Sequence, residues 1–172
     1  MHIVIDGYNL IRQSAELRRF ERIGLEAGRK QLIVRLQEFR KARGHSITVV
    51  FDGSGPLGEE RLREGAVTVV YSRRGEKADD VIKRMAAQGG KALMIVTSDR
   101  DLAYMSERFG ATVIPSRRFE QSMDEADQSR FQIDNPPDND DERRGVSGTK
   151  KKGPSRKMPK NKRVLLNRMK KL

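Results

Sequence analysis

Short apolar runs that end at polar or glycine-containing turns recur along most of the chain and predict five β-strands. These runs cover residues 2–5, 47–51, 66–71, 92–96 and 111–114. Apolar residues at helical spacing predict helices over residues 25–43, 77–88 and 99–109, each followed by a glycine. Strands alternating with helices predict an α/β domain in three layers, with helices on both faces of a central, mainly parallel sheet of four to five strands.

This pattern is lost after about residue 130. Residues 134–142 are acidic and contain proline, and residues 145–163 mix glycine, serine, proline and lysine with almost no apolar side chain. Such segments cannot bury enough surface to offset the entropy lost on ordering. We therefore predict a folded domain over residues 1–130, an acidic linker over 131–142 and a disordered basic tail over 143–172.

Charge makes nucleic acid the leading class of partner. The chain of 172 residues has a net charge of +12, and residues 143–172 carry 13 basic and no acidic side chains. Basic, unstructured segments bind phosphate backbones with steep salt dependence and no base selectivity. The alternatives for the tail are a solubilising extension and a segment that folds back on the acidic residues 120–142.

Composition also excludes several classes of protein. The chain has no cysteine and two histidines, which excludes disulfides, thiolate zinc sites and histidine-rich metal centres. The apolar run at residues 2–5 lacks the basic flank and cleavage site of an export signal. No stretch reaches the roughly 20 apolar residues of a membrane helix. We expect a soluble, cytoplasmic protein with no membrane partner.

Carboxylates follow the predicted strands at the points where the strands end. Asp6 and Asp52 come directly after an apolar run, Asp99 follows the end of another by three residues, and Asp79 and Asp80 open a helix. In an open α/β sheet these positions meet at the carboxyl edge, where ligands bind. Half-buried carboxylates without a cation would raise one another's pKa, so bound Mg²⁺ or Mn²⁺ is the natural resolution, and oxygen-only ligation disfavours zinc.

Each of these acids also has a simpler interpretation. In the simpler interpretation Asp6 caps the segment that follows it. In the alternative, Asp6 shares a cation with Asn9, three residues further along the chain. Asp52 precedes Gly53, and the frequent occurrence of aspartate in turns is enough to explain its presence there. Near the fourth strand, Thr97 and Ser98 are candidate helix caps, and Ser98 is also a candidate supporting site residue. Helix-dipole stabilisation is the favoured role of Asp101 but a weaker explanation of Asp99.

Helical geometry separates the two neighbouring aspartates. Adjacent helical residues point about 100° apart, so Asp79 and Asp80 cannot serve as equal ligands of one ion. Asp80 has basic residues three and four positions on, which indicates a solvated face, whereas Asp79 lies beside the apolar stripe. We expect Asp79 to be the better ligand and Asp80 to act through water or structurally. A structural role is favoured for Glu76.

Such a site predicts phosphodiester hydrolysis by metal-activated water, because no histidine is placed to act as general base. The basic residues near the predicted edge are candidate phosphate contacts: Arg73, Arg74, Lys77, Arg100, Arg117 and Arg118.

The motifs IVIDGYNL, VVFDGSG, GEKADDVI and VTSDRDL, in that order and spacing, resemble the NYN-domain branch of the PIN-like nucleases, and most closely the bacterial YacP-like proteins. The resemblance covers about residues 1–125. It implies a PIN-like, Rossmann-like fold and RNA cleavage dependent on Mg²⁺ or Mn²⁺. It also implies a metal site at the following residues: Asp6, Asn9, Asp79, Asp80 and Asp99. A YacP-like member is a ribosome-associated endoribonuclease, which makes mRNA and the ribosome the implied partners.

The residues after about 125 depart from the YacP-like pattern, which leaves ribosome docking without matching residues. Our hypothesis is a single-domain endoribonuclease with a basic tether. The main alternative is a non-catalytic RNA- or ribosome-binding protein on the same fold. A phosphatase of the haloacid dehalogenase type is disfavoured, because it requires a second aspartate at position 8, which is Tyr8.

Overall fold

A six-stranded sheet forms the centre of the computed structural model, which describes residues 1–55 and 60–134. The strands lie in the order β3-β4-β2-β1-β5-β6. Five of them are parallel: β1 (His2–Asp6), β2 (Ser46–Gly55), β4 (Val67–Arg73), β5 (Leu93–Val96) and β6 (Thr112–Ile114). The edge strand β3 (Glu60–Glu64) runs antiparallel to β4.

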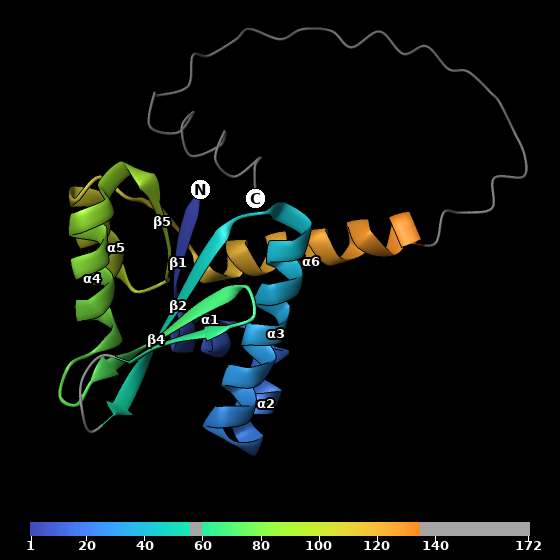
Figure 1. The fold of residues 1–172 in the computed structure, drawn as a ribbon, viewed down its shortest axis with the longest axis horizontal. Helices are drawn as coiled ribbons and strands as arrows, with labels where there is room; N and C mark the ends of the chain where they lie inside the picture. Colours follow the sequence, from blue (N-terminus) through green and yellow to red (C-terminus); the bar gives the residue numbers. More distant parts are fainter. Residues whose placement is uncertain (56–59, 135–172) are drawn as a thin grey trace, which may run out of the picture.

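Helices cover both faces of this sheet, which confirms the predicted three-layer α/β architecture (Figure 1). One layer holds α1 (Gly7–Gln13), α2 (Leu17–Ile23), α3 (Leu25–Arg43) and α6 (Ser116–Asp134). The other holds α4 (Ala78–Gly89) and α5 (Arg100–Arg108), with a short 3₁₀ turn, η1 (Gly90–Ala92), between α4 and β5.

Alternation along the buried strands fills a separate apolar core on each face. On β1, Ile3 and Ile5 belong to the core beneath α1, α3 and α6, whereas Val4 belongs to the core beneath α4 and α5. All three are fully buried. A strand covered on both faces is apolar at every position, which is why these strands are continuous apolar runs in the sequence.

One strand, β3, and three helices, α1, α2 and α6, were not predicted from the sequence. The prediction of four to five strands omitted β3, whose residues are largely exposed and include a single apolar side chain, Leu62. An edge strand that buries neither face leaves no hydrophobic pattern. The helices α1 and α2 were not predicted because each spans only seven residues, too few to display a clear helical period.

Helix α6 was not predicted, although residues up to 130 were expected to belong to the folded domain. It continues to Asp134, past residue 130, where the ordered pattern was predicted to end. The rest of the predicted acidic linker and the whole basic tail lie outside the described residues. Within the described part of the chain, no helix is long and apolar enough to cross a membrane.

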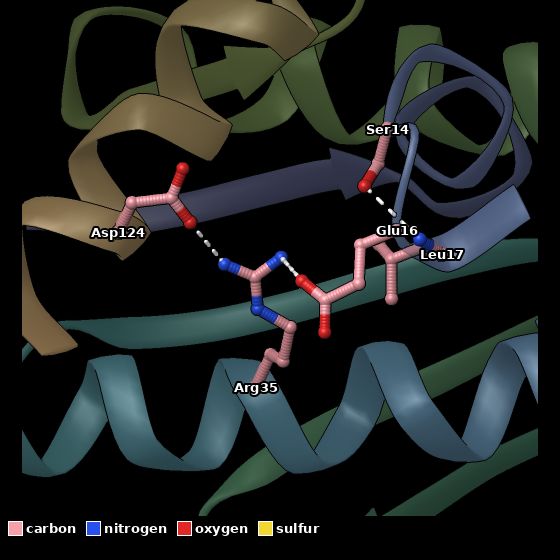
Figure 2. A network of polar contacts seen from close by, with 5 residues as sticks. All are labelled: Ser14, Glu16, Leu17, Arg35 and Asp124. Carbon is pink, nitrogen blue, oxygen red and sulfur yellow. Dashed lines mark hydrogen bonds and ion pairs between the residues drawn. The ribbon is translucent and has the colours of Figure 1, made fainter. Parts of the chain in front are cut away.

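A network of polar contacts connects α3 to α6 and to the start of α2 (Figure 2). Arg35 of α3, whose side chain is 10% exposed, donates to Glu16 Oε2 at 3.1 Å and forms a second ion pair with Asp124 of α6. Beside it, Ser14 Oγ accepts a hydrogen bond from the backbone of Leu17 and begins α2. One guanidinium thus joins α3, α6 and the segment leading into α2.

Candidate active site

The chain reverses its direction of winding across the sheet between β1 and β5. From β1 it proceeds to β2 and β4 on one side, and later returns to add β5 and β6 on the other. In open α/β sheets, the crevice at the carboxyl ends of the strands at such a reversal is the usual ligand site. Asp6 ends β1 and Thr97 directly follows β5, so both lie at this crevice.

Gly7 allows α1 to begin immediately above the sheet. A side chain at this position would place its Cβ 2.3 Å from the ring of Phe51 on β2, far inside van der Waals contact. The absence of a side chain lets the first residue of α1 lie against Phe51 directly after Asp6.

The Asp6 carboxylate is buried and tied at both oxygens. The residue is 7% exposed. Its Oδ1 atom accepts a hydrogen bond from the backbone N–H of Asn9 at 3.2 Å, and its Oδ2 atom accepts one from the Thr97 hydroxyl at 3.2 Å. Burial raises the pKa of Asp6 from 3.8 to about 6, and the charges of Asp79 and Asp52 add to the rise, against the two hydrogen bonds. A cation beside this group would be stabilised by it and would favour its ionised form.

Thr97 links the two strand ends. Besides donating to Asp6, its hydroxyl oxygen accepts from the backbone N–H of Asp99 at 3.1 Å, and the residue is 2% exposed. Asp99 itself caps α5 through a hydrogen bond from the N–H of Leu102 at 2.9 Å. Sequence reasoning weighed Thr97 only as a helix cap, because nothing in the sequence indicates that β1 and β5 are neighbours.

The side chain of Asn9 is hydrogen-bonded to other residues of the protein. Its side-chain oxygen accepts from the backbone N–H of Ser98 at 2.9 Å and from the hydroxyl of Ser116 at 2.8 Å. Ser98 Oγ in turn accepts from the N–H of Ser116. These contacts join α1, the turn after β5 and the start of α6, so the D-x-x-N motif positions the crevice walls. Ser116 was not among the predicted site residues.

The two aspartates of α4 differ as helical geometry predicted. Asp79 is partly buried, and burial, followed by the charge of Asp99, raises its pKa above the ordinary value. Asp80 is exposed and accepts from the backbone N–H of Lys77 at 3.4 Å, which places it at the start of the helix.

Asp52 and Glu76 make structural contacts. Asp52 accepts from the backbone N–H of Ala78 at 2.7 Å, which ties the end of β2 to the start of α4. Glu76 forms an ion pair with Arg84 at 2.6 Å, and that hydrogen bond lowers its pKa. The structural interpretation of Glu76 therefore holds, while Asp52 still contributes its charge to the field at Asp6 and Asp79.

The carboxylates share one field without forming a closed cage. Asp6 feels the charge of Asp79, and Asp79 feels that of Asp99. Within residues 1–55 and 60–134, however, no three acidic or histidine side chains are close enough to hold one metal ion together. The residues fit an ion such as Mg²⁺, which is commonly bound by one or two carboxylates with water and substrate phosphate completing its shell. They do not fit a three-ligand zinc site.

A hollow of about 280 Å³ opens beside Asp99. Its walls come from the turn after β5, from α5 and from β6, and include Ser98, Arg100, Ala103 and Pro115. Space for a ligand thus lies directly next to the turn that carries Asp99.

The predicted basic residues surround this edge of the sheet. They lie at the end of β4, before α4, and in the first turns of α5 and α6, and all are exposed: Arg73, Arg74, Lys77, Arg100, Arg117 and Arg118. Their arrangement supplies positive charge around the acidic crevice, while their contact with RNA stays a prediction.

Comparison with known proteins matches this chain to one family. The family model of the YacP-like NYN domain matches residues 3–171. That range corrects our expectation that the resemblance ends near residue 125. A relative from Bacillus subtilis (strain 168), described as "Uncharacterized protein YacP", is 29% identical over 85 residues, which is 49% of this chain and 50% of the relative. The matched stretch thus spans about half the length of that relative.

Solved structures show the same fold. The crystal structure of a mutant of Rae1 (YacP) from Bacillus subtilis has a TM-score of 0.67 and 20% identity, covering 82% of this chain and 86% of that one. A second crystal structure of Rae1 (YacP) gives a TM-score of 0.62 at 20% identity, covering 79% and 84%. At this identity the likeness concerns the fold alone.

Proposed function

The chain belongs to the YacP-like NYN domain family, and on that premise we propose that it is a metal-dependent endoribonuclease. Family membership indicates a nuclease-like function related to RNA. The observation that carries the finer proposal is the meeting of Asp6, Asp79 and Asp99 at the carboxyl edge, where burial and mutual charge raise the pKa of Asp6 and of Asp79.

Asp6, Asp79 and Asp99 are the residues that would hold Mg²⁺ or Mn²⁺, one or two of them as direct ligands and the others, with Asp80, through water, since no three acids of the described residues lie close enough to bind one ion together. A divalent cation there would supply stabilisation of negative charge on a phosphate and would lower the pKa of water. The protein's own part is to hold the carboxylates in place. Thr97 fixes Asp6 relative to Asp99, and Asn9 fixes the turn after β5.

The surrounding arginines and lysine supply the attraction for a polyanion. Their positions around the crevice would bring an RNA backbone onto the carboxylates, whose charge would otherwise repel it. We extend the proposal to mRNA as the substrate, to action at the ribosome and to the cytoplasm as the location, in line with the family resemblance and the net charge of +12.

A closed circle of single-stranded RNA tests the reaction, because a circle has no end for an exonuclease. We expect the protein to linearise it with Mn²⁺ or Mg²⁺ and not with EDTA. Asp79→Asn should reduce the rate by more than the roughly 10–100-fold that loss of a group supporting a metal site costs. Asp101→Asn is the matched control, since Asp101 is an exposed acid in the first turn of α5, and it should cleave like the wild type.

The rival function is RNA binding without catalysis. Metal coordination is not prearranged as a closed cage among the described residues, which is the observation that keeps this rival in view. Binding of the circle with no linearisation under any metal would favour the rival. Equal cleavage by the wild type and Asp79→Asn would remove the carboxylate site.

A further inference from the structure

Arg29 of α3 is held between two tyrosines at the edge of the sheet where the carboxylates lie. Its terminal nitrogen donates to the Tyr8 hydroxyl at 3.0 Å, and its guanidinium carbon lies 5.6 Å from the centre of the Tyr71 ring. The rings are themselves fixed, since Phe51 packs edge-on against Tyr8 at 5.2 Å and stacks with Tyr71 at 5.9 Å. The arginine therefore has a defined position.

The register of the strands places Arg29 and the rings around it near the carboxyl edge of the sheet. Asp6 on β1 pairs with Val50 on β2, and the next residue, Phe51, pairs with Tyr71 on β4. Tyr8 follows Asp6 by two residues. Phe51 and Tyr71 belong to the core under α3, on the opposite face from α4, so Arg29 lies around the edge of the sheet from Asp79.

The side-chain contacts of Arg29 are with neutral groups. Among residues 1–55 and 60–134, Arg29 forms no ion pair, although the pKa of the exposed Glu26 carboxyl three residues before it is lowered by the hydrogen bond from Lys30 and, to a smaller extent, by the charge of Arg29. A second cation, Arg12, lies 5.5 Å from the centre of the Tyr8 ring and pairs with Glu21 at 3.5 Å. Two guanidinium groups thus contact Tyr8, and Glu21 pairs with Arg12.

An arginine held by neutral groups is a ready site for phosphate. Its planar fork has five donors, of which Tyr8 takes one, and phosphate is bound by two such donors in parallel. Because Tyr8 and Tyr71 already fix the side chain, little rotamer entropy remains to be lost on binding.

We propose that Arg29 binds a backbone phosphate of the RNA strand on the α3 side of the carboxylates, with Tyr8 and Tyr71 as positioning residues. The inference rests on the proposed function and adds a second contact to it, one or more nucleotides from the scissile bond. Since Tyr71 already contacts Phe51 and Arg29, the subsite reads the backbone and adds no base preference.

Binding without turnover isolates this contact. The affinity of the full chain for a short fluorescent single-stranded RNA is measured in EDTA over a series of salt concentrations. Arg29→Gln should weaken binding several-fold at low salt and reduce the slope of log K against log salt by about 0.7, the value for one phosphate on a single strand. Arg29→Lys should keep most of the slope and lose part of the affinity, because lysine retains the charge without the fork.

A second arginine on a tyrosine provides the matched control. Arg108, at the far end of α5, lies 5.9 Å from the centre of the Tyr104 ring, away from the carboxyl edge, and Arg108→Gln should bind RNA like the wild type. Tyr8→Phe keeps the ring and the charge of Arg29 but removes the hydroxyl. It should weaken binding less than Arg29→Gln and leave the salt slope unchanged. Thermal unfolding of each variant confirms that it is folded.

The outcomes separate this inference from the proposed reaction. Unchanged affinity and slope in folded Arg29→Gln, or an equal loss in Arg108→Gln, would overturn the subsite, even if the wild type cleaves RNA. Loss of affinity in Arg29→Gln alone, in a protein that never cleaves the circle, would support the subsite and overturn the reaction. Absence of RNA binding by the wild type would overturn both.

Discussion

Asp6 has a carboxylate at a position where ionisation is unfavourable. Its pKa is raised from 3.8 to about 6, chiefly by burial. In the folded protein this group holds its proton up to higher pH than it does in the unfolded chain. Its contribution to stability is therefore fully present below pH 3.8 and is lost as the pH rises through about 6.

We therefore predict that Asp6→Asn makes the metal-free protein more stable at neutral and alkaline pH. Asparagine retains one oxygen, which can accept from the backbone N–H of Asn9 and cap α1 equally well, and its amide nitrogen can donate to the Thr97 hydroxyl oxygen in place of the bond that Asp6 accepts. The difference in pKa corresponds to a gain of up to roughly 3 kcal/mol in the free energy of unfolding. Denaturant unfolding at several pH values measures this gain, which should vanish below pH 4 or so.

Asp101→Asn serves as the control, because Asp101 is exposed. If Asp6→Asn were less stable than the wild type at alkaline pH, the account of a strained buried carboxylate would be wrong. A gain of the same size at every pH would also contradict it, because the effect would then not arise from ionisation.

At the scale of elements, Arg35 is expected to fix α6 against α3. Its largely buried guanidinium serves two carboxylates, Glu16 and Asp124 (Figure 2). Arg35→Gln removes the charge from both pairs and should lower the free energy of unfolding by about 1–2 kcal/mol, because the partners stay half-exposed and recover hydration.

Lys30→Gln is the comparison for Arg35→Gln. Lys30 pairs with Glu26 one turn away, and both side chains are largely exposed. Lys30→Gln should therefore leave the free energy of unfolding unchanged within experimental error. Equal effects of the two substitutions on the free energy of unfolding in urea would show that the ion pairs of Arg35 stabilise the protein no more than an exposed surface pair does.

The elements that the sequence predicted well are those with buried faces. The five parallel strands and the helices α3, α4 and α5 were predicted to within a few residues, apart from the longer end of β2, because apolar side chains mark their periods. The edge strand β3 and the short helices α1 and α2 left no such mark. Helix α6 was not predicted either, and it continues past residue 130, where the folded domain was expected to end, because residues 131–134 lead into an acidic stretch.

For the molecule as a whole, the sequence predicted which acidic residues lie at the carboxyl edge of the sheet better than it predicted the contacts made there. Strand ends located Asp6, Asp79 and Asp99 at one edge, and helical spacing separated Asp79 from Asp80. The tertiary contacts of Thr97, Asn9 and Arg29 depend on which strands and helices are neighbours. One sequence without its fold carries no record of those pairings.

The charge distribution leads to a prediction about the tail. Residues 143–172 carry 13 basic side chains, and their removal should weaken RNA binding and flatten its salt dependence, because fewer counterions are released. Titration of RNA at several salt concentrations measures both quantities. Identical binding by the truncated protein at every salt would contradict a role for the tail in RNA contact.

The central claim is that carboxylates from distant parts of the chain bind one hard cation at the carboxyl edge of the sheet. Its most direct test is Mn²⁺ binding to the metal-free protein, followed by electron paramagnetic resonance, for the wild type, Asp79→Asn and Asp101→Asn. The account predicts a saturable site in the wild type and in Asp101→Asn that is lost or strongly weakened in Asp79→Asn. Equal Mn²⁺ binding by all three proteins would contradict it.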